Sequence, residues 1–276
     1  MVDIRVVIVR SANSHYKRGE SMGKIIAISN QKGGVGKTTT AINLAASLSY
    51  FGKKVLLVDI DPQSNSTRGV GFDSTLVEKS VYEVITNKCE VEVATKQTSF
   101  PKMFLLPGSL NIATAEYELT MFPNSSKMLK ADLEKVKDDY NYIIIDCPPS
   151  LGLLTLNALN VAESVIIPMQ CEYYSMEGLV MLLNTIRKVQ QTSNQDIKIE
   201  GILLTMCDFR TKFSLEVQQD VRQTFKDKVF KYAIPRNIKL VEASSRGKSI
   251  IEYDIQSSGA KAYLELAKEV IKNERQ

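Results

Sequence analysis

The chain has 276 residues, of which 44% are hydrophobic and 24% charged. This composition is typical of a folded globular protein and excludes a disordered or fibrous one. Its net charge of +4, from 35 basic and 31 acidic residues, is too small to identify a partner. The single histidine, His15, and four scattered cysteines indicate no Ser-His-Asp or Cys-His mechanism, zinc motif or disulfide framework. Any chemistry must therefore rest on carboxylates, lysines, main-chain amides or a bound metal.

Residues 1–21 differ in character from the rest of the chain, with a short apolar run followed by a polar stretch. The segment fits a secretory signal poorly. Met22 offers a second possible start, so we expect 1–21 to be an extension that is either untranslated or disordered. Residues 22–276 are expected to form a single domain. The apolar runs are far shorter than the roughly 20 residues that span a bilayer, so no transmembrane segment is expected. The scattered cysteines make a reducing cytoplasm the expected location.

From Lys24 onward the hydrophobic pattern alternates between strands and helices. Short apolar runs separated by helical stretches are typical of a parallel sheet covered on both faces, so we predict a doubly wound α/β fold. The segment 87–107 is less regular, and a strand pair ending at 104–106 is one interpretation. The predicted strands are 25–28, 55–58, 142–145, 164–167 and 199–204, and the predicted helices 38–50, 125–139, 153–162, 175–191 and 213–226.

A glycine-rich loop follows the first predicted strand and directly precedes the first helix. Such a loop turns successive N–H groups toward phosphate oxygens, and the helix N-terminus adds its positive end. Lys37 is placed to reach the β- and γ-phosphates, and the Thr38 hydroxyl to ligate Mg²⁺. The standard GxxxxGK[ST] pattern fails, because Gln31 stands at its first glycine and a lysine precedes the double glycine. The predicted ATP-binding residues of the loop are Lys32, Gly33, Gly34, Val35, Gly36, Lys37, Thr38 and Thr39.

The run 32–39, Lys-Gly-Gly-Val-Gly-Lys-Thr-Thr, resembles the deviant Walker A motif of the ParA/MinD group of P-loop ATPases. In that group the extra lysine crosses a dimer interface to the partner's nucleotide. The resemblance thus implies that Lys32 would make ATP the link of a sandwich homodimer, and it adds Lys32 to Lys37 as a catalytic candidate.

Two predicted strands end in carboxylates, where ligands of open α/β sheets bind. Asp146 ends a hydrophobic strand in the Walker B manner and is a candidate Mg²⁺ ligand with Thr38. A helix-capping role is the simpler alternative for such an Asp. Asp61 lies in Asp-Pro-Gln, and the resemblance implies that it orients the attacking water; we also include it among the metal ligands. Asp59 is expected to support the geometry of the following loop.

Pro235, Arg236 and Asn237 resemble the family segment that packs around adenine, although a plain turn before a helix is the alternative. The stretch 208–248 holds ten basic and five acidic residues, a net +5, which suits a phosphate backbone but also an ordinary solvated surface. Resemblance to Soj-type proteins places Arg210 and Lys239 at non-specific DNA contacts, and Arg246 is the third candidate. The chain departs from the family pattern at three positions: it has Ser64 where the family usually has Gly, Ser244 where Pro is usual, and Lys239 where Arg is common.

Together with these residues, the resemblance implies a ParA/Soj-type partitioning ATPase. It is expected to bind ATP and Mg²⁺, form a homodimer, bind double-stranded DNA without sequence preference, and be released by slow hydrolysis that a ParB/Spo0J-like centromere-binding protein stimulates. A MinD-like membrane ATPase is the first alternative, but charges nearly cancel in the tail from Lys261, and its apolar stripe suits docking on the core. No membrane partner is therefore expected. A small-molecule ligase of the dethiobiotin-synthetase type is the second alternative.

Overall fold

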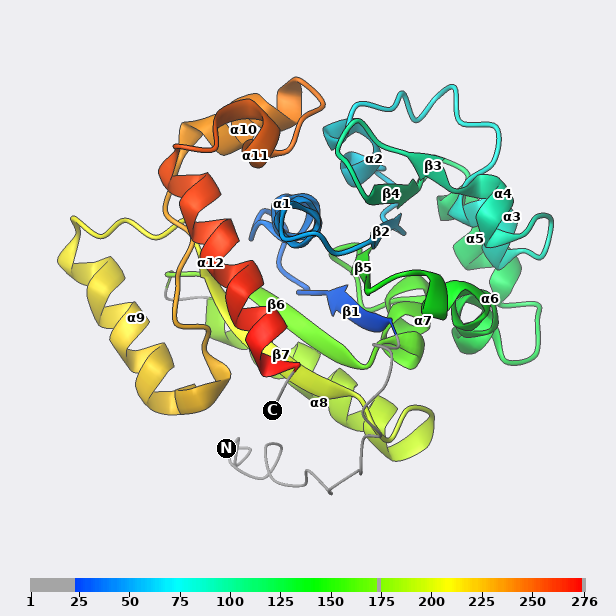
Figure 1. Ribbon diagram of the computed structural model, residues 1–276. Coiled ribbons are helices and arrows are strands. Elements are labelled where there is room, and N and C mark those ends of the chain that lie inside the picture. The colour runs from blue at the N-terminus through cyan, green and yellow to red at the C-terminus, as the bar shows by residue number, and fades with distance from the viewer. Residues whose placement is uncertain (1–22, 173–174, 275–276) are drawn as a thin grey trace.

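The computed structural model describes residues 23–172 and 175–274, and no side chain from 175 to 177. One seven-stranded sheet runs through this part of the chain in the order β3-β4-β2-β5-β1-β6-β7 (Figure 1). Every neighbouring pair is parallel except β3 and β4. The predicted doubly wound, mostly parallel sheet is therefore confirmed. The strands are β1 (Lys24–Ile28), β2 (Val55–Asp59), β3 (Lys96–Gln97), β4 (Met103–Leu106), β5 (Tyr142–Asp146), β6 (Ser164–Gln170) and β7 (Lys198–Thr205).

Helices cover both faces of the sheet (Figure 1). The helices are α1 (Lys37–Tyr50), α2 (Asn65–Gly69), α3 (Val81–Ile85), α4 (Val91–Ala94), α5 (Ile112–Leu119), α6 (Met128–Val136), α7 (Leu153–Val161), α8 (Ser175–Thr192), α9 (Lys212–Phe225), α10 (Ile238–Ser245), α11 (Ile250–Asp254) and α12 (Ser258–Asn273). Short 3-10 turns lie at Ser125–Lys127, Lys137–Asp139 and Lys226–Lys228.

The central strands supply side chains to two separate hydrophobic cores. In β1, Ile25 and Ala27 join the core beneath α3 to α9, while Ile26 and Ile28 join the core beneath α1 and α10 to α12. Because successive side chains of a strand point to opposite faces, a strand buried on both faces needs apolar residues at every position. This is the physical reason for the uninterrupted apolar runs in the sequence.

The predicted elements agree with the structure within a few residues, apart from two details. The stretch predicted as one helix at 125–139 is α6 flanked by two 3-10 turns. The strand pair expected within 87–107 exists as β3 and β4, but β3 is only two residues long, and both residues are exposed. The predicted extension at 1–21 lies outside the described residues.

The C-terminal helix α12 packs against α1. Its Tyr263, Leu266, Ala267 and Val270 are buried in the same core as α1. The Tyr263 hydroxyl also shares a buried hydrogen bond with Thr40 Oγ1 at 3.2 Å. The apolar stripe of the tail therefore serves the protein's own core, as the sequence predicted. Across the described residues, no helix is both long and apolar enough to cross a bilayer.

Candidate nucleotide site

Strand register brings the predicted chemical groups to one edge of the sheet. Ile28 at the end of β1 pairs with Asp146 at the end of β5, and Asp146 pairs in turn with Asp59 at the end of β2. The loop that follows β1 therefore starts beside two strands that end in carboxylates. In parallel α/β sheets this carboxyl edge is where ligands bind.

The loop between β1 and α1 has the backbone conformation of a phosphate cradle. Gly34 and Gly36 have φ of 72° and 87°, in the left-handed region that glycine adopts without a steric cost. Gly36 is also the N-cap of α1, so no side chain caps this helix, and its first N–H groups remain directed at the loop. A phosphate bound here would meet both the loop amides and the positive helix end.

Polar side chains from β6 and β7 fix the loop to the sheet. Gln170 Nε2 donates to the Gly34 carbonyl at 3.0 Å, and Thr205 Oγ1 donates to the Val35 carbonyl at 2.8 Å. Asn30 donates from Nδ2 to the Pro168 carbonyl at 2.7 Å. Sequence reasoning did not find Gln170 and Thr205, because only the strand order places them against the loop.

The two lysines of the loop have different surroundings. Lys37 is 7% exposed, and its Nζ donates to the main-chain carbonyl of Lys32 at 3.1 Å. Burial lowers the pKa of Lys37, while the charge of Asp146 opposes that effect. By contrast, Lys32 Nζ pairs with Glu172 Oε2 at 2.8 Å, where the side chains are 33% and 52% exposed. Lys37 thus faces the loop interior and Lys32 its rim.

Asp146 has the environment of a cation ligand. It is fully buried, and its Oδ2 accepts a hydrogen bond from Ser66 Oγ at 2.7 Å. Its Oδ1 accepts none from the described residues. Burial, and then the charge of Asp59, raise the pKa of Asp146 to about 8, against the hydroxyls of Ser66 and Thr38. A buried oxygen without a donor, beside a hydroxyl, suits the oxygen ligands that Mg²⁺ prefers, so Thr38 and Asp146 fit that ion.

Asp59 holds the loop after β2, as expected from its position. It is buried and accepts hydrogen bonds from both the amide and the hydroxyl of Thr67, each at 2.7 Å, and from the Asp61 amide at 3.2 Å. Asp61 itself is 6% exposed and accepts from the Gln63 amide at 2.8 Å. Because Asp59 carries the structural bonds, Asp61 is left with carboxylate capacity for other partners.

Ser64 occupies a strained position in the same loop. Its φ of 49° and ψ of 38° are left-handed, and its buried hydroxyl has no hydrogen-bond partner among the described residues. This is the position where the sequence departs from the family's glycine. The left-handed backbone explains why glycine suits the position.

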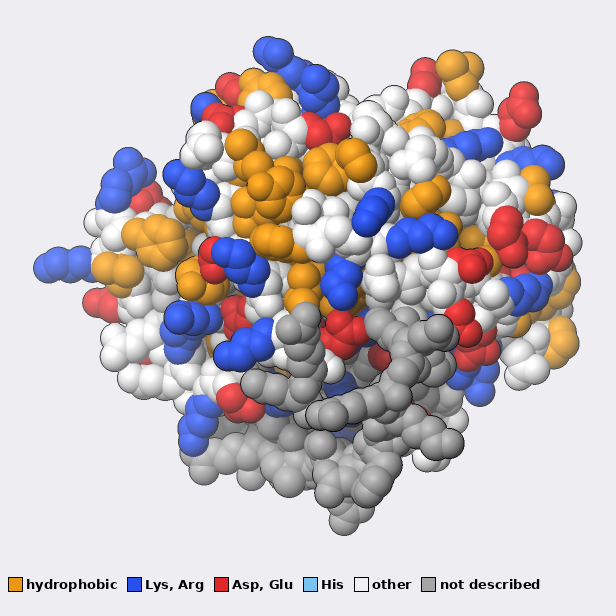
Figure 2. Space-filling view, viewed as in Figure 1, with side chains coloured by type: hydrophobic (Ala, Val, Ile, Leu, Met, Phe, Trp, Pro, Cys, Tyr) orange, Lys and Arg blue, Asp and Glu red, His pale blue; other side chains and the backbone are white. Residues whose placement is uncertain are grey.

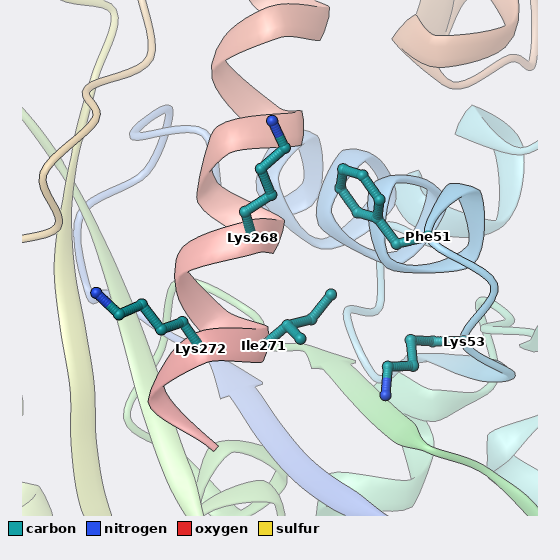
Figure 3. A pocket seen from close by; sticks show the side chains of 5 residues that line it. All are labelled: Phe51, Lys53, Lys268, Ile271 and Lys272. Atoms are coloured by element: carbon teal, nitrogen blue, oxygen red, sulfur yellow. The ribbon is translucent and has the colours of Figure 1, made fainter. Parts of the chain in front are cut away.

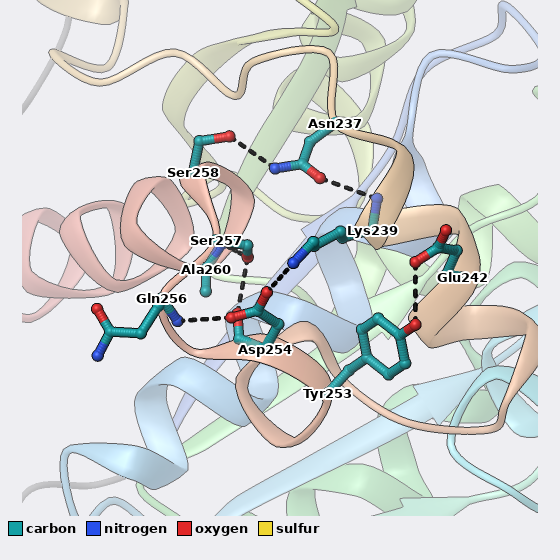
Figure 4. A network of polar contacts seen from close by, with 9 residues as sticks. All are labelled: Asn237, Lys239, Glu242, Tyr253, Asp254, Gln256, Ser257, Ser258 and Ala260. Atoms are coloured by element: carbon teal, nitrogen blue, oxygen red, sulfur yellow. Dashed lines mark hydrogen bonds and ion pairs between the residues drawn. The ribbon is translucent and has the colours of Figure 1, made fainter.

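The segment Pro235–Asn237 lies beside the end of β7. The Arg236 amide donates to the Cys207 carbonyl at 3.1 Å, and Arg236 lines a cavity of about 150 Å³ together with Gln170 and Met206. The Asn237 side chain, however, caps α10 through the Lys239 amide and donates to Ser258 Oγ at 2.6 Å (Figure 4). Arg236 therefore borders this cavity, whereas the side chain of Asn237 already has structural partners.

The three predicted DNA-binding cations are exposed, and two of them are paired with carboxylates. Arg210 donates from Nε and Nη2 to the two oxygens of Asp208, at 2.9 and 2.8 Å. Lys239 pairs with Asp254 (Figure 4). Arg246 lies over the ring of Tyr253. Basic and acidic side chains are interspersed on the face that Figure 2 shows.

A larger hollow of about 360 Å³ lies away from the phosphate loop (Figure 3). It sits between the C-terminal ends of α1 and α12, and α1 begins at the loop and ends near the hollow. Fourteen residues of helix separate the two places by about 20 Å. The hollow is lined by Phe51, Lys53, Lys268, Ile271 and Lys272, and contains none of the predicted nucleotide ligands.

Comparison with known proteins agrees with this geometry. A family model described as an AAA domain matches residues 23–199. The chain is 55% identical over 252 residues to the sporulation initiation inhibitor protein Soj of Bacillus subtilis, covering 91% of this chain and 100% of that protein. It is 48% identical over 263 residues to the chromosome partitioning protein ParA of Myxococcus xanthus, covering 94% and 93%.

Solved structures with bound nucleotide share the fold. The crystal structure of cobyrinic acid a,c-diamide synthase from Mycobacterium smegmatis with bound ADP and magnesium has a TM-score of 0.82 at 39% identity, and the match covers 92% of this chain and 96% of that one. The septum site-determining protein MinD of Pyrococcus horikoshii, with Mg-ADP, has a TM-score of 0.75 at 28% identity and covers 91% and 97%. With its phosphate loop, its carboxylates and these relatives, the chain belongs to the Soj/ParA family of chromosome-partitioning P-loop ATPases.

Proposed function

We propose that this protein is a nucleotide-driven DNA-partitioning switch. In this proposal it binds ATP with Mg²⁺, forms a homodimer around the nucleotide, and then binds double-stranded DNA without sequence preference. Slow ATP hydrolysis, stimulated by a ParB-like partner, returns it to the monomer that releases DNA. The cargo is a chromosome or a plasmid.

The contrast between Lys32 and Lys37 carries the proposal. Lys37 is buried in its own loop, where its ammonium would meet the β- and γ-phosphates. Lys32 contributes a main-chain carbonyl to that loop, while its ammonium lies on the exposed rim against Glu172. An exposed ion pair is worth little, so a phosphate of a second protomer can replace Glu172 at small cost. A metabolic ligase has no use for a lysine in this position.

The hydrolytic step depends on groups at the carboxyl edge of the sheet. In this proposal Thr38 and Asp146 hold Mg²⁺, and the bound ion would neutralise charge on the phosphates. Asp61 is the proposed residue that orients the attacking water, and Lys37 stabilises charge on the phosphates. With no histidine in the described residues, this site relies on positioning rather than on a strong general base, which favours slow turnover.

Dimerisation would also explain how a modest basic surface binds DNA. Arg210, Lys239 and Arg246 are exposed, yet Asp208 and Asp254 offset two of these charges. One copy of such a surface binds phosphate weakly. Two copies held together by ATP act at high effective concentration, which raises the affinity without any new contact.

The decisive experiment measures the oligomeric state and DNA binding of the same samples. Light scattering with ATP, ADP or no nucleotide should detect a dimer with ATP alone, and Lys32→Ala should remain monomeric while still binding ATP. Glu172→Gln is the matched control for loss of the ion pair and should dimerise. A Lys32→Ala protein that dimerises like the wild type would contradict the proposal.

DNA binding should follow the dimer. Fluorescence anisotropy with a random-sequence duplex should detect salt-sensitive binding with ATP only. Arg210→Ala should weaken that binding, whereas Lys198→Ala, which removes an exposed cation at the opposite, amino edge of the sheet, should not. Binding that is equal with and without nucleotide would rule out the switch.

The structure does not favour the MinD-like alternative. Membrane binding through the tail needs an apolar helix face that is free. In α12 the large apolar residues Tyr263, Leu266 and Val270 are buried against the core. Anionic vesicles with ATP should therefore retain none of the protein, and retention would reverse this preference.

A further inference from the structure

Two thiols that lie far apart in the sequence meet beside the candidate nucleotide site. Cys171 directly follows β6, and Cys207 lies two residues after the end of β7. The ends of these neighbouring strands are in register, with Gln170 opposite Thr205. The sulfur atoms are 3.1 Å apart, and both residues are free cysteines that are buried. They need to approach by only about 1 Å to reach the bonded S–S distance.

The surroundings give the two thiols different roles. Cys171 lines the cavity of about 150 Å³ together with Gln170 and Arg236, so a small oxidant that enters this cavity can reach the Cys171 thiol. Its pKa is lowered by the hydrogen bond with Cys207, and the positive charge of Arg222 adds to this effect. The pKa of Cys207 is raised by the same hydrogen bond and by burial. Because Cys171 lines the cavity and Cys207 does not, the oxidant meets Cys171 first, and as a thiolate Cys171 is the nucleophile of the pair.

We propose that Cys171 and Cys207 form a reversible intramolecular disulfide that ties the phosphate side of the nucleotide site to its base side. The oxidant is a peroxide such as hydrogen peroxide. The Cys171 thiolate attacks one peroxide oxygen, so an S–O bond forms, the O–O bond breaks and the leaving hydroxide takes up a proton as water. Cys207 then attacks the sulfenic sulfur, the S–S bond forms and the S–O bond breaks, and a second water leaves. Two thiols are oxidised and one peroxide is reduced to two waters.

The two cysteines lie in segments that contact different parts of the nucleotide site, so a disulfide between them would connect those parts. Next to Cys171, Gln170 holds the Gly34 carbonyl and Glu172 holds Lys32, so this side is joined to the phosphate loop. On the other side, the main chain of Cys207 exchanges hydrogen bonds with Ile234 and Arg236. A disulfide would therefore link the loop around the phosphates to the segment Pro235–Asn237, which is predicted to contact the base, and would restrict their separation.

Bond formation is tested on the full chain without nucleotide. One equivalent of hydrogen peroxide should reduce the free thiols from four to two and yield, in a non-reducing digest, a peptide pair joined through Cys171 and Cys207. Dithiothreitol should restore all four thiols. Cys89→Ser is the matched control, because it removes the more exposed cysteine and keeps the pair. Four remaining thiols, or a bond through Cys89, would overturn the proposal.

The consequence for the site is tested by the release of a fluorescent ADP analogue. This consequence rests on the proposed nucleotide site, whereas bond formation does not, so the two can fail separately. Oxidised protein should release the analogue about threefold more slowly, because release from such sites commonly requires loop opening. Cys207→Ser and Cys171→Ser, treated in the same way, should show no change. A disulfide that forms without slowing release of the analogue would contradict the proposal that it restricts movement between the phosphate loop and the segment Pro235–Asn237.

Discussion

The ammonium of Lys37 donates a hydrogen bond to the main-chain carbonyl of Lys32 across 3.1 Å. One lysine of the loop is thereby oriented by the backbone of the other. The same contact leaves the Lys32 side chain to extend toward Glu172 on the rim. A single loop can thus offer one cation to its own nucleotide and a second cation to another molecule.

Replacing Lys37 should abolish most nucleotide affinity. Lys37→Met removes a charged hydrogen-bond donor from a buried position, and we expect ATP to bind about 10- to 100-fold more weakly. Titration with a fluorescent ATP analogue measures this. Lys32→Ala should change the affinity of the monomer by about twofold or less, since it breaks an exposed ion pair. Equal losses in the two variants would contradict the division of roles.

Replacing Asp61 should separate binding from hydrolysis. Asp61→Asn keeps the shape of the side chain and its acceptor for the Gln63 amide, but loses the charge that we assign to water orientation. We expect phosphate release to fall by about 100-fold or more while the ATP analogue still binds. Asp73→Asn, at an exposed position in the loop after α2, is the control and should hydrolyse ATP at the wild-type rate.

Removing the charge of Asp208 should strengthen DNA binding. The Arg210 guanidinium holds the pKa of Asp208 well below its usual range, so this carboxylate stays charged and competes with phosphate for Arg210. Asp208→Asn should tighten ATP-dependent duplex binding by about two- to fivefold, as measured by anisotropy. Asp220→Asn makes the same charge change at an exposed position of α9 and serves as control. An equal gain in both variants would mean that net charge alone, rather than the Arg210 pair, limits binding.

Ser64→Gly should stabilise the protein. The substitution relieves a left-handed backbone at φ 49° and removes a buried hydroxyl without a partner among the described residues. Allowing for the extra freedom of glycine in the unfolded chain, we expect a gain of about 0.5–1 kcal/mol in the free energy of unfolding. Urea unfolding measures it. Ser64→Ala removes only the hydroxyl, and a gain as large as that of glycine would show that backbone strain is not the cause.

Leu266→Ala should test the docking of α12. Leu266 is fully buried in the core shared with α1, so its truncation should lower the free energy of unfolding by about 2–5 kcal/mol. Lys261→Ala, at an exposed position of the same helix, should change it by about 0.5 kcal/mol or less. Near-equal stability of the two variants would indicate that α12 is detached in solution.

The long elements and the phosphate loop were predictable because their signals are local. Apolar runs indicate the buried strands, and glycines with flanking lysines indicate the phosphate-binding loop. The sequence pattern does not predict α2, α3, α4, α5 and α11. Four of these helices have only four or five residues and α5 has eight, too few for a clear periodicity. The Asn237 side chain caps α10, and the contact of Pro235–Asn237 with the base stays a prediction.

By itself, the sequence determined the fold class, the phosphate loop and the two strands that end in carboxylates, because these depend on residues close together in the chain. Only the tertiary structure decided which distant groups meet. Strand order placed Asp59 beside Asp146, Gln170 against the loop, Glu172 on Lys32 and Cys171 on Cys207. The reason is physical: strand order and register come from the burial of both sheet faces over the whole chain, and no local pattern encodes them.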